Sequence, residues 1–355
     1  MASIFDFVNN REIAQFWSEL TQDREPFPLQ ALWPDRQKLG LDLKWLKGSK
    51  GLPVTLSTSA YDAASIPRPR MGFERLTTQM PYFKESKYID EELRQELNMV
   101  LETGNQTYIE AVISRVFDDQ TELLEAASSA REMMRAMVLT SGVISIAGAN
   151  GQAFDYDYGV PAAHKGNAAV KWTSYATADP MEDIRVAVQK VLDDTGVTMT
   201  RGIVSGKTWR DLRNCEMVRK GIFVASAVTG VTSAVPNDAA VRAYVLQEVG
   251  ITLAVHDKRY SYKDSTGNLI QTKYIPDDTL TLFPEGSLGN TWFGTTPAQS
   301  DLMGSGVANV SIVDTGVAIV TAKKVDPVQV ETIVSQISLP DFPMADKIYI
   351  MDTNP

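Results

Sequence analysis

One long helix constrains the fold of this chain more than any other feature. Between Asn105 and Gly142 apolar residues recur every three or four positions, with charged residues between them and no proline or glycine. Such spacing is typical of one face of an α-helix. About 35 residues at roughly 1.5 Å each predict a rod of about 50 Å, far longer than an average helix. We expect a sheet to pack along it. The apolar positions include Ile109, Val112, Ile113, Val116, Leu123, Ala127, Ala130, Met134 and Met137.

The composition excludes several classes of protein. The chain has 34 Lys and Arg residues against 44 Asp and Glu residues, a net charge of −10. Coating duplex DNA needs many Lys and Arg contacts to phosphates, so we do not expect that function. The single cysteine, Cys215, excludes an intramolecular disulfide and zinc clusters built on several cysteines. Histidine chemistry would have to use His164 or His256.

The sequence shows no signal for a membrane. No basic segment followed by an apolar one stands at the N-terminus, and the longest uncharged stretch, 136–154, is too polar to span a bilayer. We therefore expect a chain that is made and kept in the cytoplasm, or released without a secretory route.

The first fifty residues scatter aromatic side chains among prolines. Two interpretations remain open: the segment packs on its own core, or it is an arm that lays its aromatic side chains on a neighbouring molecule. The aromatic residues are Phe5, Phe7, Phe16, Trp17, Phe27, Trp33 and Trp45.

Residues 52–80 predict a long hairpin. Val54 and Leu56 alternate with polar residues, and the run 73–78 returns towards Pro81. Strands of about a dozen residues would reach roughly 40 Å. A two-stranded ribbon of that length is marginal alone, so we expect either a third strand of the same chain or another molecule to cover it.

The rest of the chain alternates helices with strands, and the class is α+β. A helix capped by Asp90 runs to Gly104, and another runs from Asp179-Pro180 to near Gly196. Two more helices are expected over 207–218 and 238–249. Strands are expected over 143–147, 153–158, 198–204, 251–255, 279–283, 307–313, 317–322, 328–337 and 347–351, with a hairpin over 260–274.

The strongest chemical motif is the segment 202–208, which contains Gly202, Gly206, Lys207 and Thr208. A phosphate-binding loop needs four residues between its glycines, and this segment has three. The favoured interpretation is a strand, a turn and a helix with Ser205 as N-cap, and with Trp209 and Leu212 facing the core.

Other candidate groups carry weaker signals. The carboxylates of Asp155, Asp157, Glu182 and Asp183 could bind a divalent cation, although acidic residues near strand and helix starts are usually solvated or capping. Each histidine is more typical of a surface or hydrogen-bonded side chain than of a base. We expect Cys215 to be a core residue inside a helix.

Several local strings, taken in chain order, resemble one known family. They are Phe73-Glu-Arg-Leu-Thr-Thr-Gln-Met-Pro81, Gly151-Gln-Ala-Phe-Asp-Tyr-Asp-Tyr-Gly159, Trp172 with Ala178-Asp179-Pro180-Met-Glu-Asp183-Ile184, Val204 with Trp209 and Leu212, Ile275-Pro-Asp-Asp-Thr-Leu-Thr-Leu-Phe-Pro284, Leu288-Gly289 and Gly294-Thr-Thr-Pro297. Their order over residues 70–355 resembles the lambda-type major capsid protein E family of tailed bacteriophages, which has the HK-ninety-seven-type capsid fold. The first seventy residues match only in general character.

The resemblance implies a division of the chain. Residues 1–50 would be an N-terminal arm, and 51–81 an extended loop that lies over the adjacent subunit. Residues 82–164 and 306–355 would form a peripheral domain whose spine helix covers about 105–140. Residues 165–305 would form an axial domain around the five- and six-fold axes.

The implied function is structural: a major capsid protein that assembles as hexamers and pentamers into the icosahedral shell around the double-stranded DNA of a tailed phage. It would be assembled in the host cytoplasm and located in the virion, with no catalytic residue, cofactor or metal. The partners would be other copies of the chain, a separate scaffolding protein, a portal at one vertex, a decoration protein, and DNA through weak non-specific contact, with no membrane. An acidic shell interior would let packed DNA slide. A nucleotide-binding enzyme using 202–208, or a cellular nanocompartment shell of the same fold, remains the alternative.

The expected contacts between subunits come from the arm and the extended loop. Arg68 and Arg70 are the candidates for charge contacts, with simple solvation as the alternative. The full set is Phe5, Phe7, Trp17, Tyr61, Ile66, Arg68, Arg70, Phe73 and Arg75.

Overall fold

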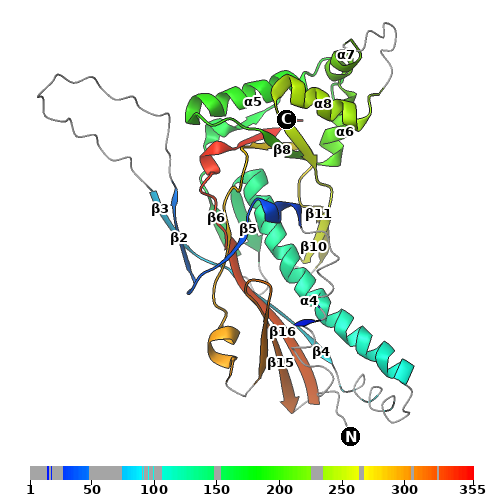
Figure 1. Ribbon diagram of the computed structural model, residues 1–355, viewed down its shortest axis with the longest axis vertical. Helices are drawn as coiled ribbons and strands as arrows, with labels where there is room; N and C mark the ends of the chain where they lie inside the picture. Colours follow the sequence, from blue (N-terminus) through cyan, green and yellow to red (C-terminus); the bar gives the residue numbers. More distant parts are fainter. Residues whose placement is uncertain are drawn as a thin grey trace, which may run out of the picture. The chain divides into compact units, whose positions relative to one another are not determined.

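The structure is a computed structural model whose described residues form two compact units (Figure 1). The first comprises Met1–Lys44, Thr77–Met134 and Asn290–Asp341, and the second comprises Trp45–Leu76, Arg135–Gly289 and Phe342–Pro355. The described residues are 14–15, 17, 27–47, 74–89, 91, 95, 99, 106–147, 153–224, 235–263, 268–304, 308–325 and 328–355.

The long helix α4 runs from Gln106–Ser141, which confirms the helix predicted from its apolar spacing. Its side chains are described from Thr121 on. Leu123, Leu124 and Ala127 are buried against strands of the first unit. The helix ends at Gly142, whose φ of 75° lies in the left-handed region. A Cβ at that position would stand 2.5 Å from Val160, so the close approach also requires glycine.

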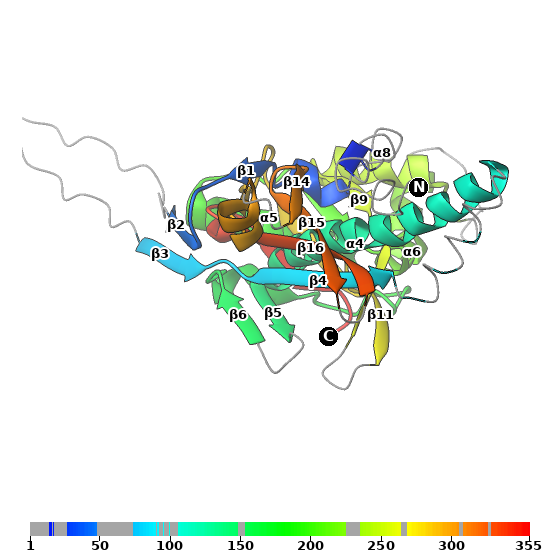
Figure 2. The ribbon, with the colours of Figure 1, turned by 90° about the horizontal axis from the view of Figure 1, so that it is seen from below.

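A sheet of the first unit packs on α4, as expected from the length of the helix. Val317, Ile319, Val330 and Val334 belong to the same buried cluster as the apolar face of α4, and Figure 2 shows β15 and β16 beside the helix. All neighbouring strands are antiparallel except β1 and β13. The strand order is β1 (Asp35–Gln37), β13 (Thr291–Phe293), β16 (Val328–Pro340), β15 (Val317–Val325) and β14 (Asn309–Val313), with β4 (Tyr82–Ile89) also paired to β16.

The second unit is an α/β structure with its own core. Its five-stranded sheet has the order β7 (Lys165–Asn167), β17 (Tyr349–Asp352), β12 (Thr279–Phe283), β8 (Arg201–Val204) and β9 (Thr252–Val255). The core includes the fully buried Trp172, Ile184 and Leu212. The helices of this unit are α5 (Pro180–Thr195), α6 (Gly206–Asn214), α7 (Glu216–Val224) and α8 (Asp238–Val249).

Three two-stranded ribbons complete the described strands. They are β2 (Asp42–Lys47) with β3 (Glu74–Gln79), β5 (Val143–Ala147) with β6 (Ala153–Asp157), and β10 (Arg259–Lys263) with β11 (Leu269–Lys273). Short helical turns lie at Pro28–Ala31, Ala162–His164, Ala298–Leu302 and Ala345–Lys347.

Several predicted elements need correction. The helix expected over 207–218 is two helices, α6 and α7, because Cys215 between them has an extended ψ of 133°. The return strand of the hairpin is present as β3, but its partner is β2, which precedes the run 54–57 named from the sequence. That run lies outside the described residues. Strands β1, β2, β4, β7 and β13 were not predicted.

The two compact units divide the chain in their own way, and the domain bounds expected from the sequence stay a prediction. The returning segment 306–355 supplies β14, β15 and β16 to the first unit, but its last strand, β17, belongs to the sheet of the second unit. Strand β13, inside the expected axial range 165–305, pairs in the first unit. The axial and peripheral roles of the two units remain predictions.

Candidate functional site

The loop between β8 and α6 is the segment that most resembled a phosphate-binding loop. Ser205 is the N-cap of α6, and its Oγ accepts a hydrogen bond from the Thr208 N–H at 3.3 Å. Trp209 and Leu212 are buried, with 5% and 0% of their surface exposed. The interpretation as a strand, a capped turn and a helix is therefore confirmed.

A carboxylate of the chain itself occupies the start of α6. The Gly206 N–H donates to Asp257 Oδ1 at 3.0 Å, and a Cβ on Gly206 would lie 1.9 Å from Asp257 Oδ2. Burial would raise the pKa of Asp257, but the Gly206 N–H and the Lys273 ammonium outweigh it and hold this pKa below its usual range. A phosphate at this helix end would have to displace an ionised carboxylate.

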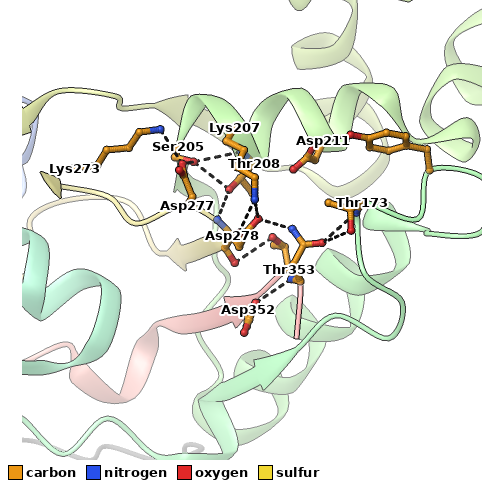
Figure 3. Close-up of polar contacts among 12 residues, drawn as sticks. Thr173, Ser205, Lys207, Thr208, Asp211, Lys273, Asp277, Asp278, Asp352 and Thr353 are labelled. Carbon is orange, nitrogen blue, oxygen red and sulfur yellow. Dashed lines mark hydrogen bonds and ion pairs between the residues drawn. The ribbon is translucent and has the colours of Figure 1, made fainter.

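The ammonium group of Lys207 is also paired with a carboxylate of the same chain. Its Nζ donates to both carboxylate oxygens of Asp278 at 2.6 Å, and this hydrogen bond raises the pKa of Lys207 (Figure 3). Asp278 has a φ of 64°, a left-handed conformation that Asp tolerates better than most residues. Its N–H donates to Thr208 Oγ1 at 2.9 Å, so the same turn is joined to α6 twice.

The C-terminal segment joins the same network (Figure 3). The Asp278 carbonyl accepts hydrogen bonds from the N–H and the hydroxyl of Thr353, at 2.8 and 3.1 Å. Asn354 donates to the Asp278 carboxylate and accepts from the Thr173 hydroxyl at 2.9 Å. The network is therefore a structural brace between α6, the turn before β12 and the end of the chain. Its polar groups are paired with one another, which leaves the loop without the features of a nucleotide site.

Both histidines are buried, and of the two expected environments, surface or hydrogen-bonded, they have the second. His164 is 1% exposed, and its Nε2 lies 3.1 Å from an oxygen of Asp194. His256 is 4% exposed and stacks on Tyr274 with ring centroids 5.7 Å apart. Burial, assisted by the charge of Lys258, lowers the pKa of His256.

The thiol of Cys215 is fully buried, so its expected place in the core is confirmed. Burial raises its pKa to about 12. The carboxylate of Asp183 has two protein donors, the Ala169 N–H at 3.0 Å and the Trp172 indole at 2.8 Å. Within the part of the chain that the structure describes, no group of three or more His, Cys, Asp or Glu residues is placed to hold a metal ion.

The predicted contact residues lie mostly outside the described residues. This holds for Phe5, Phe7, Tyr61, Ile66, Arg68, Arg70 and Phe73. Trp17 is described and only 3% exposed, and its indole donates to Asp314 Oδ1 at 3.3 Å. At this position the arm packs on its own core. Arg75 lies in β3.

Surface apolar residues that the sequence did not single out are candidates for contacts. Leu39 is 85% exposed, Leu269 64% and Val186 57%. A sequence pattern could not identify them, because their exposure depends on which neighbours the fold leaves uncovered. These three lie on different segments of the chain, and single exposed apolar side chains are normal on a soluble protein, so each would mark a contact only where other apolar groups gather beside it.

Comparison with known proteins identifies the family of this chain. The family model described as phage major capsid protein E matches residues 19–340, nearly the whole chain. The chain belongs to this family. Among curated proteins, none matches the sequence significantly.

Solved structures agree with the family at the level of the fold. A protein assigned as the capsid protein of a prophage of Escherichia coli CFT073 is 15% identical, with a TM-score of 0.58 over 97% of this chain and 99% of that one. A phage-related protein from Bordetella bronchiseptica RB50 is 14% identical, with a TM-score of 0.55 over 98% and 97%. A subunit of the cyanophage A-1(L) capsid is 10% identical, with a TM-score of 0.50 over 92% of both chains.

This phage major capsid protein E family member has the HK-ninety-seven-type capsid fold. It is a structural protein that forms an icosahedral shell by self-association, located in the capsid of the virion, and it is not an enzyme. Within the described residues, no helix has the length and apolar character needed to cross a membrane.

Proposed function

We propose that copies of this chain form hexamers and pentamers that close into a shell around double-stranded DNA. The family match over residues 19–340 carries this proposal, because it extends over both compact units of the chain. Closed rings of a single chain require two different surfaces on each subunit, one facing each neighbour. The loop at 202–208 does not compete with this function, since its cationic and N–H groups are bound internally.

Each part of the chain takes a role in this proposal. Residues 1–50 act as the arm, 51–81 as the loop that extends over the neighbouring subunit, and 165–305 as the axial domain. The length of α4 supports its role as the spine of the peripheral domain. The residues proposed to touch a neighbour are those of the arm and extended loop, with Arg68 and Arg70 as charge contacts. Trp17 is covered by its own chain and is not among the residues proposed to touch a neighbour.

The proposed partners follow from shell assembly. A separate scaffolding protein directs closure, a portal occupies one vertex, and a decoration protein binds the finished surface. The net charge of −10 favours weak, non-specific contact with the packaged DNA.

The test is expression of the full chain, alone and with candidate scaffolding proteins, followed by sedimentation velocity and negative-stain electron microscopy. We expect rings of five and six, or closed shells. Because contacts repeat in every subunit, assembly is expected to be steep in protein concentration.

A nucleotide-binding measurement on the same proteins separates the capsid function from the alternative of a nucleotide-binding enzyme. Neither the parent chain nor Lys207→Ala is expected to bind ATP or GTP in equilibrium dialysis. A chain that stays monomeric with every scaffolding candidate, and that loses ATP binding in Lys207→Ala, would contradict the proposal.

A further inference from the structure

The ribbon β10–β11 projects from the second unit without a third strand among the described residues. Toward its tip Tyr262 is 42% exposed, Ile270 37% and Leu269 64%. Tyr262 faces Ile270 across the ribbon, so these two side chains share one face, whereas Leu269 lies on the other. An isolated two-stranded ribbon is only marginally stable in water, and apolar side chains on both of its faces add to that cost.

A stack of aromatic rings holds the base of this ribbon in place. His256 stacks on Tyr274, and Tyr274 stacks on Tyr260 with centroids 4.7 Å apart. Burial raises the pKa of Tyr260 to about 12. Tyr262 continues the row at 5.9 Å from Tyr260, but it is exposed. The ribbon is thus anchored at one end and presents apolar surface at the other.

The charge of this ribbon is opposite to that of the whole chain. Residues 258–273 contain four basic residues and one acidic residue, in a chain with a net charge of −10. Lys273 is already neutralised by Asp257 and Asp277. Arg259 is exposed at the start of β10. The ribbon therefore favours an acidic partner with some apolar surface.

A second ribbon of the same unit has the complementary charge. Residues 143–157, which form β5 and β6, contain two acidic residues and no basic one. Asp155 and Asp157 are exposed on the same face, because they alternate along β6. Figures 1 and 2 show the two ribbons apart from each other, and Figure 2 shows both on the same side of the unit.

We propose that the β10–β11 ribbon of one subunit docks on the β5–β6 ribbon of a second copy of this chain. Charge complementarity favours a second copy as the partner. A basic, apolar ribbon and an acidic ribbon stand apart on the same side of one unit. Two different, complementary patches on one chain make a head-to-tail contact, and such contacts form a ring where the rotation between neighbours closes. This inference rests on the proposed assembly into hexamers and pentamers and names a contact within those rings.

A basic ribbon with exposed aromatic and apolar side chains could instead contact nucleic acid. The second copy is favoured because a matching acidic ribbon is present on the chain itself, and because the paired Lys273 is not free to bind phosphate. Binding of DNA is retained as an outcome of the test.

The experiment is a charge exchange in the full chain, expressed with its scaffolding protein. Four proteins are compared by sedimentation velocity: the parent, Arg259→Glu, Asp155→Lys and the variant with both changes. A ring of six contains this contact six times. If the charge change weakens each contact roughly twofold, the equilibrium constant for forming the ring falls about sixtyfold. We expect each single variant to reduce the assembled fraction at least tenfold, and the double variant to restore it.

Lys171→Glu is the matched control, because Lys171 is exposed in the same unit and the change in charge is the same. Slow reaction of the buried Cys215 with Ellman's reagent verifies that each variant is folded. Restoration by the double variant, without restoration when Asp155→Lys is combined with Lys171→Glu, supports the docking of the two ribbons.

Other outcomes overturn the inference in different ways. If the parent forms no rings with any scaffolding candidate, the proposed function itself fails. If the parent assembles and Arg259→Glu assembles as well as Lys171→Glu, the rings close through other surfaces. If Arg259→Glu assembles normally but retains less DNA, the ribbon contacts nucleic acid, and the docking between copies is wrong.

Discussion

At the scale of single residues, Asp278 combines a left-handed backbone with an ion pair to Lys207. Changing it to Ala forces a side chain with no local hydrogen bond into that conformation and removes the pair. We expect Asp278→Ala to lower the free energy of unfolding by about 1–2 kcal/mol. Asp278→Asn tolerates the same φ and loses only the charge, so it should cost less than about 1 kcal/mol for a partly exposed pair.

Urea unfolding of both variants, followed by tryptophan fluorescence, measures these differences. Asp278→Gly serves as the control for backbone strain, because glycine adopts a positive φ without cost. Equal losses for the Ala and Asn variants would show that the ion pair, and not the backbone, determines the stability of the turn.

His256 gives the second unit a dependence on pH. Its pKa is lowered by burial in the folded chain, so the unfolded state binds the proton more readily. The stability it contributes is fully present above the unfolded pKa of about 6.5 and is lost as the pH falls towards the folded pKa. Each unit of depression corresponds to about 1.4 kcal/mol at the acidic limit.

His256→Phe keeps an aromatic ring against Tyr274 and removes the titrating group. We expect its urea midpoint to change less than that of the parent between pH 7.5 and pH 5.5. The comparison uses the same fluorescence signal at each pH. A variant profile as steep as that of the parent would assign the acid sensitivity to other groups.

The sequence was informative about residues whose role depends on near neighbours. Ser205 was identified as an N-cap because its hydroxyl and the N–H group that donates to it lie within one turn of α6. The carboxylates that occupy the loop could not be found in this way. Asp257 and Asp278 reach the loop only after the strands β8, β9 and β12 pair. Asp257 is 51 residues away from its partner Gly206, and Asp278 is 71 residues away from its partner Lys207.

At the scale of elements, the long helix α4 is fixed to its sheet by Arg131. This side chain is 6% exposed, donates to Gln336 at 2.9 Å and pairs with Asp314 at 3.1 Å. It also stands over the ring of Phe293, at 5.5 Å. We expect Arg131→Met to lower the free energy of unfolding of the first unit by about 2–3 kcal/mol, because Gln336 and Asp314 lose a buried partner.

Glu122 provides the matched control on the same helix. It pairs with Lys87 of β4, but its side chain is 68% exposed. Glu122→Met should therefore cost less than about 1 kcal/mol. Chemical denaturation of both variants tests the contrast. If the exposed pair costs as much as the buried one, the helix is not held through Arg131.

Helices were predicted more reliably than strands, for a physical reason. The bounds of α4, α5 and α8 follow from apolar spacing and from caps such as Asp179 and Gly196, which act within the helix itself. Strand β4 carries three charged residues among its eight and has no clean alternation. Its pairing with β16 joins residues more than 240 positions apart, and no local pattern reports such a partner.

At the scale of the whole molecule, the extended loop is predicted to matter for assembly and not for folding. Deleting 60–72 removes Tyr61, Ile66, Arg68 and Arg70, whereas the paired strands β2 and β3 lie outside the deletion. We expect the deleted chain to fold, with Cys215 still slow to react, because burial shields the thiol from the reagent and raises its pKa.

The same deleted chain is expected to form no closed shells with any candidate scaffolding protein that supports assembly of the parent, because each lost contact is repeated in every subunit of the lattice. Sedimentation velocity measures the assembled fraction, and negative-stain microscopy shows whether rings persist. A Gly-Ser segment of equal length in place of 60–72 separates the effect of the side chains from that of the shortened loop. Shells of normal size from either variant would place the decisive contacts elsewhere, and the two ribbons of the second unit would then be the next surfaces to remove.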